Sequence, residues 1–363
     1  MGKKVLDLIL LLCFTFLFTA CSGGAQPTDD TSSNTVEETQ EAPKELRTIK
    51  IGYAPGIGNI LGFIAEERGI AAKEGIKLEF VPFSNSSDGL NALNADKIDV
   101  GVSFGTAAPL TFVTQGVDFS IFGGYLSGGM PIYAKPDFKY TGPESFIGKT
   151  VVTARLYTPD IVWRAAMHEA GIDIEKDLTL IEVKKPTEIL EIVKAGKADV
   201  GIGTGSTYAK ALESGLVAVA WSNDLWNPVH VCCRPVAKTQ WLNENGDLAK
   251  AFLRAFIQAE KVYYEEPEYA VELNKKYLEL DDELARIMTL ESNQIIESDP
   301  KSKGVKYMWE RLHDIGYLNA PEIDINEHIN IELYKEALDE LTAENPGDAF
   351  YQKLQERFVE YNL

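Results

Sequence analysis

The chain has 363 residues and carries 35 Lys and Arg against 55 Asp and Glu, a net charge of −20 at pH 7. The phosphates of a nucleic acid would be repelled by so acidic a surface, which excludes nucleic acid as a partner. The four cysteines are Cys13, Cys21, Cys232 and Cys233. The last two are adjacent, so stability is expected to come from a hydrophobic core and not from spaced disulfides.

The first twenty residues predict a signal peptide. Lys3 and Lys4 precede an apolar run over 8–20, which is shorter than the roughly 20 residues that a membrane-spanning helix needs. Cys21 follows this run directly and resembles the processing site of bacterial lipoproteins, where the new N-terminal cysteine is lipidated. We therefore expect removal of 1–20, a lipid on Cys21, and attachment to the extracytoplasmic face of the cell membrane through this lipid only.

The next segment predicts a tether. Residues 22–45 are rich in Ser, Thr, Gly, Asp, Glu and Gln and contain almost no large apolar side chain. Such a segment buries too little surface to offset its ordering entropy. We expect 21–46 to be a disordered link between the lipid and the folded part.

From residue 47 the chain alternates between strand and helix patterns. The predicted helices include 160–170 and 186–195, and the predicted strands are 48–53, 76–81, 98–103, 119–125, 150–153, 178–183, 200–203 and 217–221. This alternation implies parallel sheets with right-handed crossovers. From residue 248 to the end the pattern is nearly all helical, with a core stripe that includes Phe252 and Phe256. The predicted fold class is therefore α/β, with two lobes and a helical C-terminal segment.

A twelve-residue pattern occurs twice, one hundred positions apart. Residues 95–106 read ADKIDVGVSFGT and residues 195–206 read AGKADVGIGTGS, with identity at six of the twelve positions. Each copy predicts a strand, a tight turn and a helix N-terminus, one copy in each lobe. Two helix N-termini at one cleft would favour an anionic or polar acceptor group.

Several segments carry a resemblance to a known family, and they occur in the family's order. They are IGYAP at 51–55, ERG at 67–69 with KEGIKL at 73–78, the segment 91–106, GKTVV at 148–152, the second copy of the repeat, VCCR at 231–234, NEN at 243–245 and FLRAF at 252–256. Over about 47–345 the chain resembles the nitrate/sulfonate/taurine-type substrate-binding proteins of ABC importers.

The resemblance implies a type II periplasmic-binding-protein fold, also called a venus flytrap. The chain would cross between lobes near 132–137 and 229–236, so that lobe one comprises 47–137 plus 234–363 and lobe two comprises 138–233. It implies a monomeric extracytoplasmic lipoprotein that captures a small solute between its lobes and delivers it to the permease of an ABC importer. It also implies no catalysis and no cofactor.

Ligands of such proteins bind at the carboxyl ends of the strands, between the lobes. The residues predicted to bind the ligand are Tyr53, Pro55, Gly56, Asn59, Gly105, Thr106, Tyr125, Arg155, Tyr157, Thr158, Thr204, Gly205 and Ser206. Arg155 and Arg234, together with the helix N-termini, favour a small anion such as an alkanesulfonate, taurine or nitrate. Relatives also bind thiamine-precursor pyrimidines and flavins, and Tyr53, Tyr125, Tyr157 and Trp221 are candidates to stack on such rings.

The residues suggest three other interpretations. His230 with Cys232 and Cys233 suggests a metal site, but adjacent residues of a strand point to opposite faces, so we expect no metal. A pyrimidine-forming enzyme shares the scaffold and needs a histidine, a cofactor lysine and a cysteine-rich loop, whereas 47–167 contain no histidine. A sensory lipoprotein that binds a ligand without feeding an importer stays open as an alternative.

Overall fold

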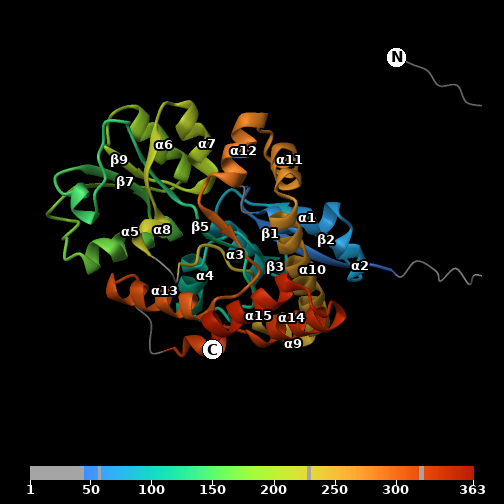
Figure 1. Ribbon diagram of the computed structural model, residues 1–363. Helices are drawn as coiled ribbons and strands as arrows, with labels where there is room; N and C mark the ends of the chain where they lie inside the picture. Colours follow the sequence, from blue (N-terminus) through green and yellow to red (C-terminus); the bar gives the residue numbers. More distant parts are fainter. Residues whose placement is uncertain (1–44, 56–58, 227–229, 319–322) are drawn as a thin grey trace, which may run out of the picture. The chain divides into compact units, whose positions relative to one another are not determined.

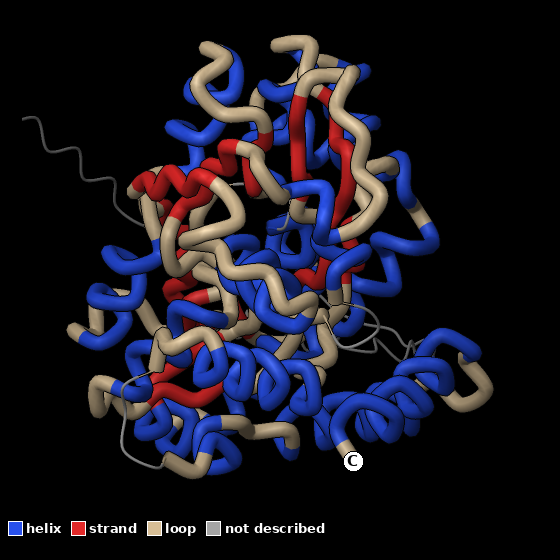
Figure 2. The backbone as a smooth tube through the Cα atoms, turned by 90° about the vertical axis from the view of Figure 1, so that its left-hand side faces the viewer, coloured by secondary structure: helices blue, strands red, loops and turns tan. Residues whose placement is uncertain are grey.

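The computed structural model describes residues 45–55, 59–226, 230–318 and 323–363. The expected signal peptide, the lipid site Cys21, nearly all of the tether, and Gly56 of the expected ligand site lie outside these residues. All described residues belong to one unit, Lys44–Leu363. Their strands gather in two separate groups, which form two five-stranded sheets (Figure 2).

The first sheet combines strands from the beginning of the chain with one strand from its second half. Its order is β2 (Ile76–Pro82), β1 (Arg47–Tyr53), β3 (Val100–Gly101), β11 (Val236–Lys238) and β4 (Phe119–Ile121). Strands β2, β1 and β3 are parallel, whereas β11 runs antiparallel to both β3 and β4. The helices between its strands are α1 (Ile60–Glu67), α2 (Ile70–Lys73), α3 (Ser86–Asn94) and α4 (Ala107–Thr114).

The second sheet repeats this layout. Its order is β10 (Val217–Trp221), β6 (Pro131–Ala134), β9 (Val200–Ile202), β7 (Thr150–Ala154) and β8 (Thr179–Val183). Strands β8, β7 and β9 are parallel, and β6 is antiparallel to β9 and β10. Its connections contain η2 (Pro143–Phe146), α5 (Thr158–Glu169), α6 (Pro186–Lys194), α7 (Gly205–Glu213) and α8 (Ser222–Leu225) (Figure 1).

The chain passes between the sheets twice, once between β4 and β6 and once between β10 and β11. Strand β6 falls on the lobe-one side of the boundary expected at residue 137, and its pairing puts it in the second sheet. The first passage therefore precedes the expected position at 132–137. Strand β5 (Leu126–Gly128) of the first passage pairs with β12 (Gln294–Ile296) of the C-terminal part in a small antiparallel ribbon.

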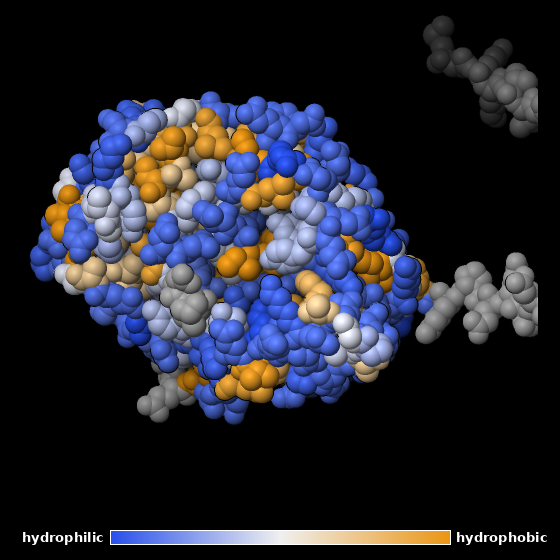
Figure 3. Space-filling model, in the orientation of Figure 1, coloured by the Kyte–Doolittle hydropathy of each residue, from blue (hydrophilic) through white to orange (hydrophobic). Residues whose placement is uncertain are grey.

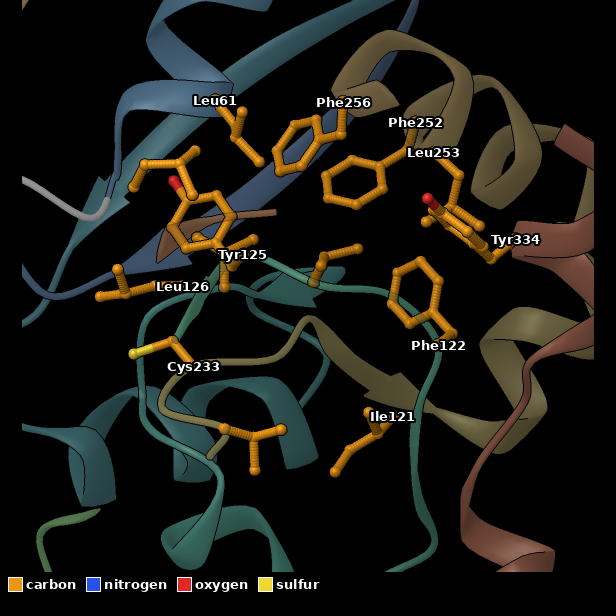
Figure 4. Packing of buried hydrophobic residues seen from close by; sticks show 14 of the residues in the cluster. Leu61, Ile121, Phe122, Tyr125, Leu126, Cys233, Phe252, Leu253, Phe256 and Tyr334 are labelled. Atoms are coloured by element: carbon orange, nitrogen blue, oxygen red, sulfur yellow. The ribbon is translucent and has the colours of Figure 1, made fainter. Parts of the chain in front are cut away.

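The C-terminal part is helical, as expected from its sequence. It comprises α9 (Thr239–Glu244), α10 (Gly246–Glu265), α11 (Pro267–Leu278), α12 (Asp282–Leu290), α13 (Ser302–Asp314), η3 (Ile325–His328), α14 (Glu332–Glu344) and α15 (Ala349–Asn362). The stripe on α10 is buried and packs with residues of the first half, since Phe256 lies 5.6 Å from Tyr125 and 4.0 Å from Phe252 between ring centroids (Figure 4). Among the described residues, no helix combines the length and the apolar character needed to cross a membrane.

The twelve-residue repeat has a structural cause. The carboxylate of Asp99 accepts the backbone N–H of Lys50 on β1 at 2.7 Å, and that of Asp199 accepts the N–H of Thr150 on β7 at 2.8 Å. The turn before each strand contains a residue with positive φ, Asp96 at 56° and Gly196 at 68°. Each copy therefore closes a tight turn and then fixes the register of a parallel strand.

The glycine that follows each aspartate makes room for an aromatic ring. A Cβ on Gly101 would lie 2.7 Å from the ring of Phe104, and one on Gly201 would lie 2.6 Å from the ring of Tyr133. Both rings are fully buried. The Asp-Val-Gly sequence thus serves strand register and close packing in both sheets.

Candidate ligand-binding cavity

A cavity of about 500 Å³ lies where the carboxyl ends of parallel strands from both sheets come together. Its wall includes Ser84 after β2, Gly105 after β3, Tyr157 after β7, Thr187 after β8 and Gly205 after β9. The volume is within the range of roughly 300–1,000 Å³ that is usual for small-molecule sites. Parallel strands bring their following loops to one edge, which explains why segments so distant in sequence share this wall.

Seven of the predicted ligand residues line the cavity: Pro55, Asn59, Gly105, Tyr157, Thr158, Thr204 and Gly205. Both copies of the repeat are represented, by Gly105 and by Gly205. Ser206 belongs to the first turn of α7, and Gly56 lies outside the described residues.

Three other predicted residues lie behind the wall. Tyr53 packs edge-on against Phe63 and Phe80. Tyr125 is fully buried, its hydroxyl donates to Asn59 at 3.3 Å, and burial raises its pKa well above the usual value. Thr106 is also fully buried. These three residues are absent from the wall itself; Tyr125 and Thr106 are fully buried, and Tyr53 is half-buried.

The last four residues of the two copies of the repeat, 103–106 and 203–206, are called the first and the second corner. Thr106 connects the first corner with the start of α5 and with Cys232 in the passage that leaves the second sheet. Its hydroxyl donates to the carbonyl of Cys232 at 2.9 Å, and its backbone N–H donates to the hydroxyl of Thr158 at 3.4 Å. Gly105 has a φ of 79°, and a Cβ there would lie 2.8 Å from the Thr158 hydroxyl. The starts of α4 and α5 therefore meet closely beside the cavity.

The two arginines expected to recognise an anion lie outside the wall. Arg155 is exposed, pairs with Glu182 at 3.1 Å, and places its guanidinium 4.9 Å from the ring centroid of Tyr317. Arg234 is fully buried and uses all five N–H donors, on the carbonyls of Pro300, Leu126 and Cys233, the hydroxyl of Ser127, and the carboxylate of Glu297 at 2.7 Å. With no donor left, Arg234 secures the passage between the sheets.

Trp221, considered as a stacking residue, lies elsewhere. Its ring contacts Tyr208 with centroids 5.0 Å apart, in a cluster that includes Met288 of α12. This packing joins the second sheet to the C-terminal helices. Trp221 is thus occupied by a structural contact.

The loop that carries Tyr157 is braced by a buried ion pair. Asp160 accepts the backbone N–H of Leu156 at 3.1 Å, pairs with Arg164 at 2.8 Å, and accepts the hydroxyl of Tyr317 at 3.1 Å. Burial raises the pKa of Asp160, and the Arg164 guanidinium opposes this shift. Leu156 has a φ of 69°, which turns the chain sharply before Tyr157. This bracing positions the aromatic ring at the cavity.

Sequence reasoning missed more than half of the wall. The missed residues are Ala54, Phe83, Ser84, Asn85, Ser86, Ser103, Phe104, Leu126, Gly128, Gly129, Met130, Pro159, Lys185, Pro186, Thr187, Cys232, Cys233 and Gln294. The groups after β2 and β8 obey the same strand-end rule and could have been found with it. The residues of the passages and Gln294 depend on long-range pairing, which the sequence pattern does not reveal.

The wall combines apolar and polar surfaces. Phe83, Phe104, Tyr157, Leu126 and Met130 provide apolar area, and serine, threonine, asparagine and glutamine residues provide hydrogen-bonding groups. Among the described wall residues, Lys185 is the one with a permanent charge. Helices α3, α5, α6 and α7 all begin at the wall, so several helix N-termini contribute partial positive charge.

The cysteine pair departs from expectation. The backbone N–H groups of Cys232 and Cys233 both donate to the carbonyl of Leu126, at 3.1 and 2.9 Å. Because consecutive N–H groups point the same way, this segment is not a regular strand, and the two side chains do not point to opposite faces. Their sulfur atoms lie 3.5 Å apart.

Comparison with protein families identifies the chain. The model of the NMT1-like family matches residues 42–276, which is more than half of the sequence. The chain belongs to the NMT1-like family. The match covers both five-stranded sheets and both passages between them. Comparison with curated proteins gave no match.

Solved structures share the fold of this NMT1-like chain. The periplasmic aliphatic sulphonate binding protein SsuA from Escherichia coli is 19% identical, with 80% of this chain and 99% of that chain covered and a TM-score of 0.66. The periplasmic nitrate-binding protein NrtA from Synechocystis is 18% identical, with coverage of 82% and 89% and a TM-score of 0.69. A ligand binding component of an ABC-type import system from Staphylococcus aureus, with zinc bound, is 17% identical, with coverage of 80% and 99% and a TM-score of 0.67. The expected periplasmic-binding-protein fold is confirmed.

Proposed function

We propose that this NMT1-like protein is the solute-binding component of an ABC importer. The observation that carries the proposal is the position of Gly105 and Gly205, the penultimate residues of the two copies of the repeat, which line a single cavity. A solute that contacts both corners stabilises the arrangement in which they are close together, and a permease that recognises this arrangement then receives the solute. The fold shared with SsuA and NrtA supports the same role.

The proposal includes the location and state of the protein. A lipid on Cys21 holds it at the extracytoplasmic face of the cell membrane, and the tether of 21–46 gives the domain reach to the permease. The protein acts as a monomer, and the solute leaves chemically unchanged. Recovery of the bound solute in unaltered form tests the last point, and a Schiff-base absorbance with pyridoxal phosphate would contradict it.

The cavity favours an organic anion of the sulfonate or taurine class. The N-termini of α3, α5, α6 and α7 and the ammonium group of Lys185 provide positive charge for an anionic end. The apolar surfaces of Phe83 and Met130 suit a carbon body, and the volume exceeds what nitrate alone would fill. A thiamine-precursor pyrimidine or a flavin is the second candidate, favoured by the rings of Phe83 and Tyr157 and by the absence of arginine from the described wall.

A thermal-shift screen of alkanesulfonates, taurine, nitrate, pyrimidines and flavins tests the proposal. A solute at about 100 times its Kd stabilises the protein by about 2.7 kcal/mol, which gives a clear rise in Tm. Lys185→Ala should weaken the binding of a sulfonate, and its exposed neighbour Lys184, outside the wall, provides the matched control Lys184→Ala. Phe83→Leu should instead weaken a stacked heteroaromatic. A screen in which no solute raises Tm would contradict the proposal.

A further inference from the structure

Three sulfur atoms from two distant segments meet at the cavity wall. The Sγ atom of Cys232 lies 3.5 Å from the Sγ atom of Cys233 and 3.6 Å from the Sδ atom of Met130. The three residues are between 4% and 7% exposed, and all line the cavity. Met130 belongs to the passage that enters the second sheet, whereas the cysteines belong to the passage that leaves it. Cys233 is visible beside Leu126 and below Tyr125 in Figure 4.

The backbone holds these sulfurs in place. Leu126 accepts both cysteine N–H groups, Thr106 donates to the carbonyl of Cys232 at 2.9 Å, and Arg234 donates to the carbonyl of Cys233 at 2.8 Å. Such a frame reduces the entropy that the cysteines would lose on binding a common ion. The arrangement is therefore preorganised by bonds from several elements.

The ligand set selects a class of ion. Thiolate and thioether sulfur together favour soft ions, above all Cu(I), and a thioether is a poor ligand for hard cations. Sulfur ligands about 2.3 Å from a tetrahedral metal lie roughly 3.8 Å apart. The observed separations of 3.5 and 3.6 Å need only a small widening to reach such a geometry.

Two ionised thiols would supply the charge for a cation. A metal ion binds the thiolate form of cysteine, so it displaces the thiol protons of Cys232 and Cys233 when it binds. Two thiolates and one monovalent cation leave a net charge of −1 near the guanidinium of Arg234.

We propose that Cys232, Cys233 and Met130 bind one Cu(I) ion at the cavity wall. The ion joins the two passages between the sheets and keeps a coordination position that faces the cavity. This site shares the cavity wall with the proposed solute site, but copper binding does not require the solute. Copper titrations without solute test the site, and solute titrations without copper test the proposed function, so failure of either is distinguishable from failure of the other.

Anaerobic titration of the reduced, processed protein, which lacks 1–20 and carries its lipid on Cys21, with Cu(I) tests the proposal. Equilibrium dialysis counts the copper per chain, and near-ultraviolet absorbance detects charge transfer from thiolate to copper. We expect one equivalent in the wild type. Cys232→Ser and Cys233→Ser should each weaken binding by more than the roughly 10–100-fold that loss of an outer-shell partner costs. Met130→Leu, which conserves volume, should weaken it by about 10-fold.

Met167 provides the control, because it is fully buried in the core of the second sheet and lies outside the wall. Met167→Leu should bind copper as the wild type does, and circular dichroism verifies that every variant is folded. Copper binding that persists in Cys232→Ser, or a folded and reduced wild type that binds none, would overturn the proposal. Zn(II) binding as tight as Cu(I) binding and unaffected by Met130→Leu would also overturn it, as would a disulfide between the two cysteines that withstands reductant.

Discussion

The two copies of the twelve-residue repeat are equivalent in their first part and different in their second. Asp99 and Asp199 make the same bond to a neighbouring parallel strand, and Gly101 and Gly201 each accommodate an aromatic ring. After these glycines the copies diverge. Phe104 is fully buried, whereas its counterpart Thr204 is half-buried, and Thr106 of the first copy is bonded to the carbonyl of Cys232.

This difference separates two tasks that the sequence repeat does not distinguish. The shared part builds the same strand edge twice, as sheet geometry requires. The first corner anchors the passage between the sheets through Thr106 and faces the cavity through Gly105, whereas the second corner faces the cavity through Thr204 and Gly205. Sequence identity between the copies therefore marks structural roles, and function depends on the residues that follow them.

The largest effect on the free energy of unfolding is expected at Arg234, which secures the passage between the sheets. Arg234→Ala would leave Glu297 buried beside an empty space, although Lys301 still pairs with it at 2.7 Å. Loss of one partner of a buried ion pair costs about 3–5 kcal/mol, so we expect a loss of this size in the free energy of unfolding. Urea unfolding of the variant measures it. Arg155→Ala removes an exposed pair and should cost below about 1 kcal/mol. Equal losses of unfolding free energy in Arg234→Ala and Arg155→Ala would contradict the contrast between the buried and the exposed arginine.

The stability of the protein should also depend on pH through His230, which lies in the passage between β10 and β11. Burial lowers the pKa of this histidine to about 3, so the folded protein binds its proton less readily than the unfolded chain does. The stability that depends on neutral His230 is complete above pH 6.5 and is lost as pH falls toward 3, by about 3 kcal/mol at pH 4. His230→Phe should flatten the dependence of the unfolding free energy on pH by about 1.4 kcal/mol per unit in this window. An unchanged slope would show that His230 is accessible to protons in the folded state.

Replacement of the two corner glycines sharpens the comparison. Gly105→Ala places a Cβ on left-handed backbone and 2.8 Å from the Thr158 hydroxyl, which should cost about 2 kcal/mol. Gly205 begins helix α7, where alanine is the better helix former, so Gly205→Ala should leave Tm almost unchanged. Differential scanning calorimetry measures both. A larger loss at Gly205 would reverse the assignment of anchoring to the first corner.

The smallest effect concerns the hydroxyl of Thr106. Thr106→Val removes the hydrogen bond to Cys232 while conserving shape, and a loss of about 1 kcal/mol is expected. Thr158 still donates to the same carbonyl at 3.4 Å, which limits the loss. Thr106→Ser keeps the hydroxyl and should recover most of the unfolding free energy. If Thr106→Ser and Thr106→Val have the same free energy of unfolding, the hydrogen bond to Cys232 makes no measurable contribution to stability.

Much of the fold could be predicted because its elements are periodic and local. The expected strands at 48–53, 76–81, 150–153, 178–183, 200–203 and 217–221 and the helices at 160–170 and 186–195 correspond to observed elements. The predicted strands at 98–103 and 119–125 are shorter in the structure, and β5, β6, β11 and β12 were not predicted. These four are short and pair with distant segments, so their own sequence carries little signal.

The site was predictable only where it follows strand ends. Gly105 and Gly205 were found through the repeat, and both line the cavity. Arg155 and Arg234 were chosen for their charge, but their ion pairs with Glu182 and Glu297 are tertiary features. The proximity of the two cysteine sulfurs is also a tertiary feature, because it depends on hydrogen bonds from both cysteine N–H groups to the carbonyl of Leu126.

The exterior agrees with the composition, since most of the surface in view in Figure 3 is hydrophilic and the apolar areas are separated. Exposed large hydrophobic residues such as Leu46, Ile147 and Val217 lie far apart in the sequence, whereas Val359 and Leu363 lie one turn apart at the end of α15. Scattered apolar residues are usual on protein surfaces. The cavity is distinguished by its position, because the carboxyl ends of strands from both sheets meet there.

Titration calorimetry with the tightest solute from the screen tests most directly whether both sheets contact one solute. Ser86 follows β2 of the first sheet, Thr187 follows β8 of the second, and both line the cavity. We expect Ser86→Ala and Thr187→Ala each to weaken affinity by about 5–10-fold, as loss of one hydrogen bond implies. Ser87→Ala and Thr179→Ala, exposed and outside the wall, should leave Kd unchanged. If variants of only one sheet alter Kd, or if none does, a single solute held between the two corners is contradicted.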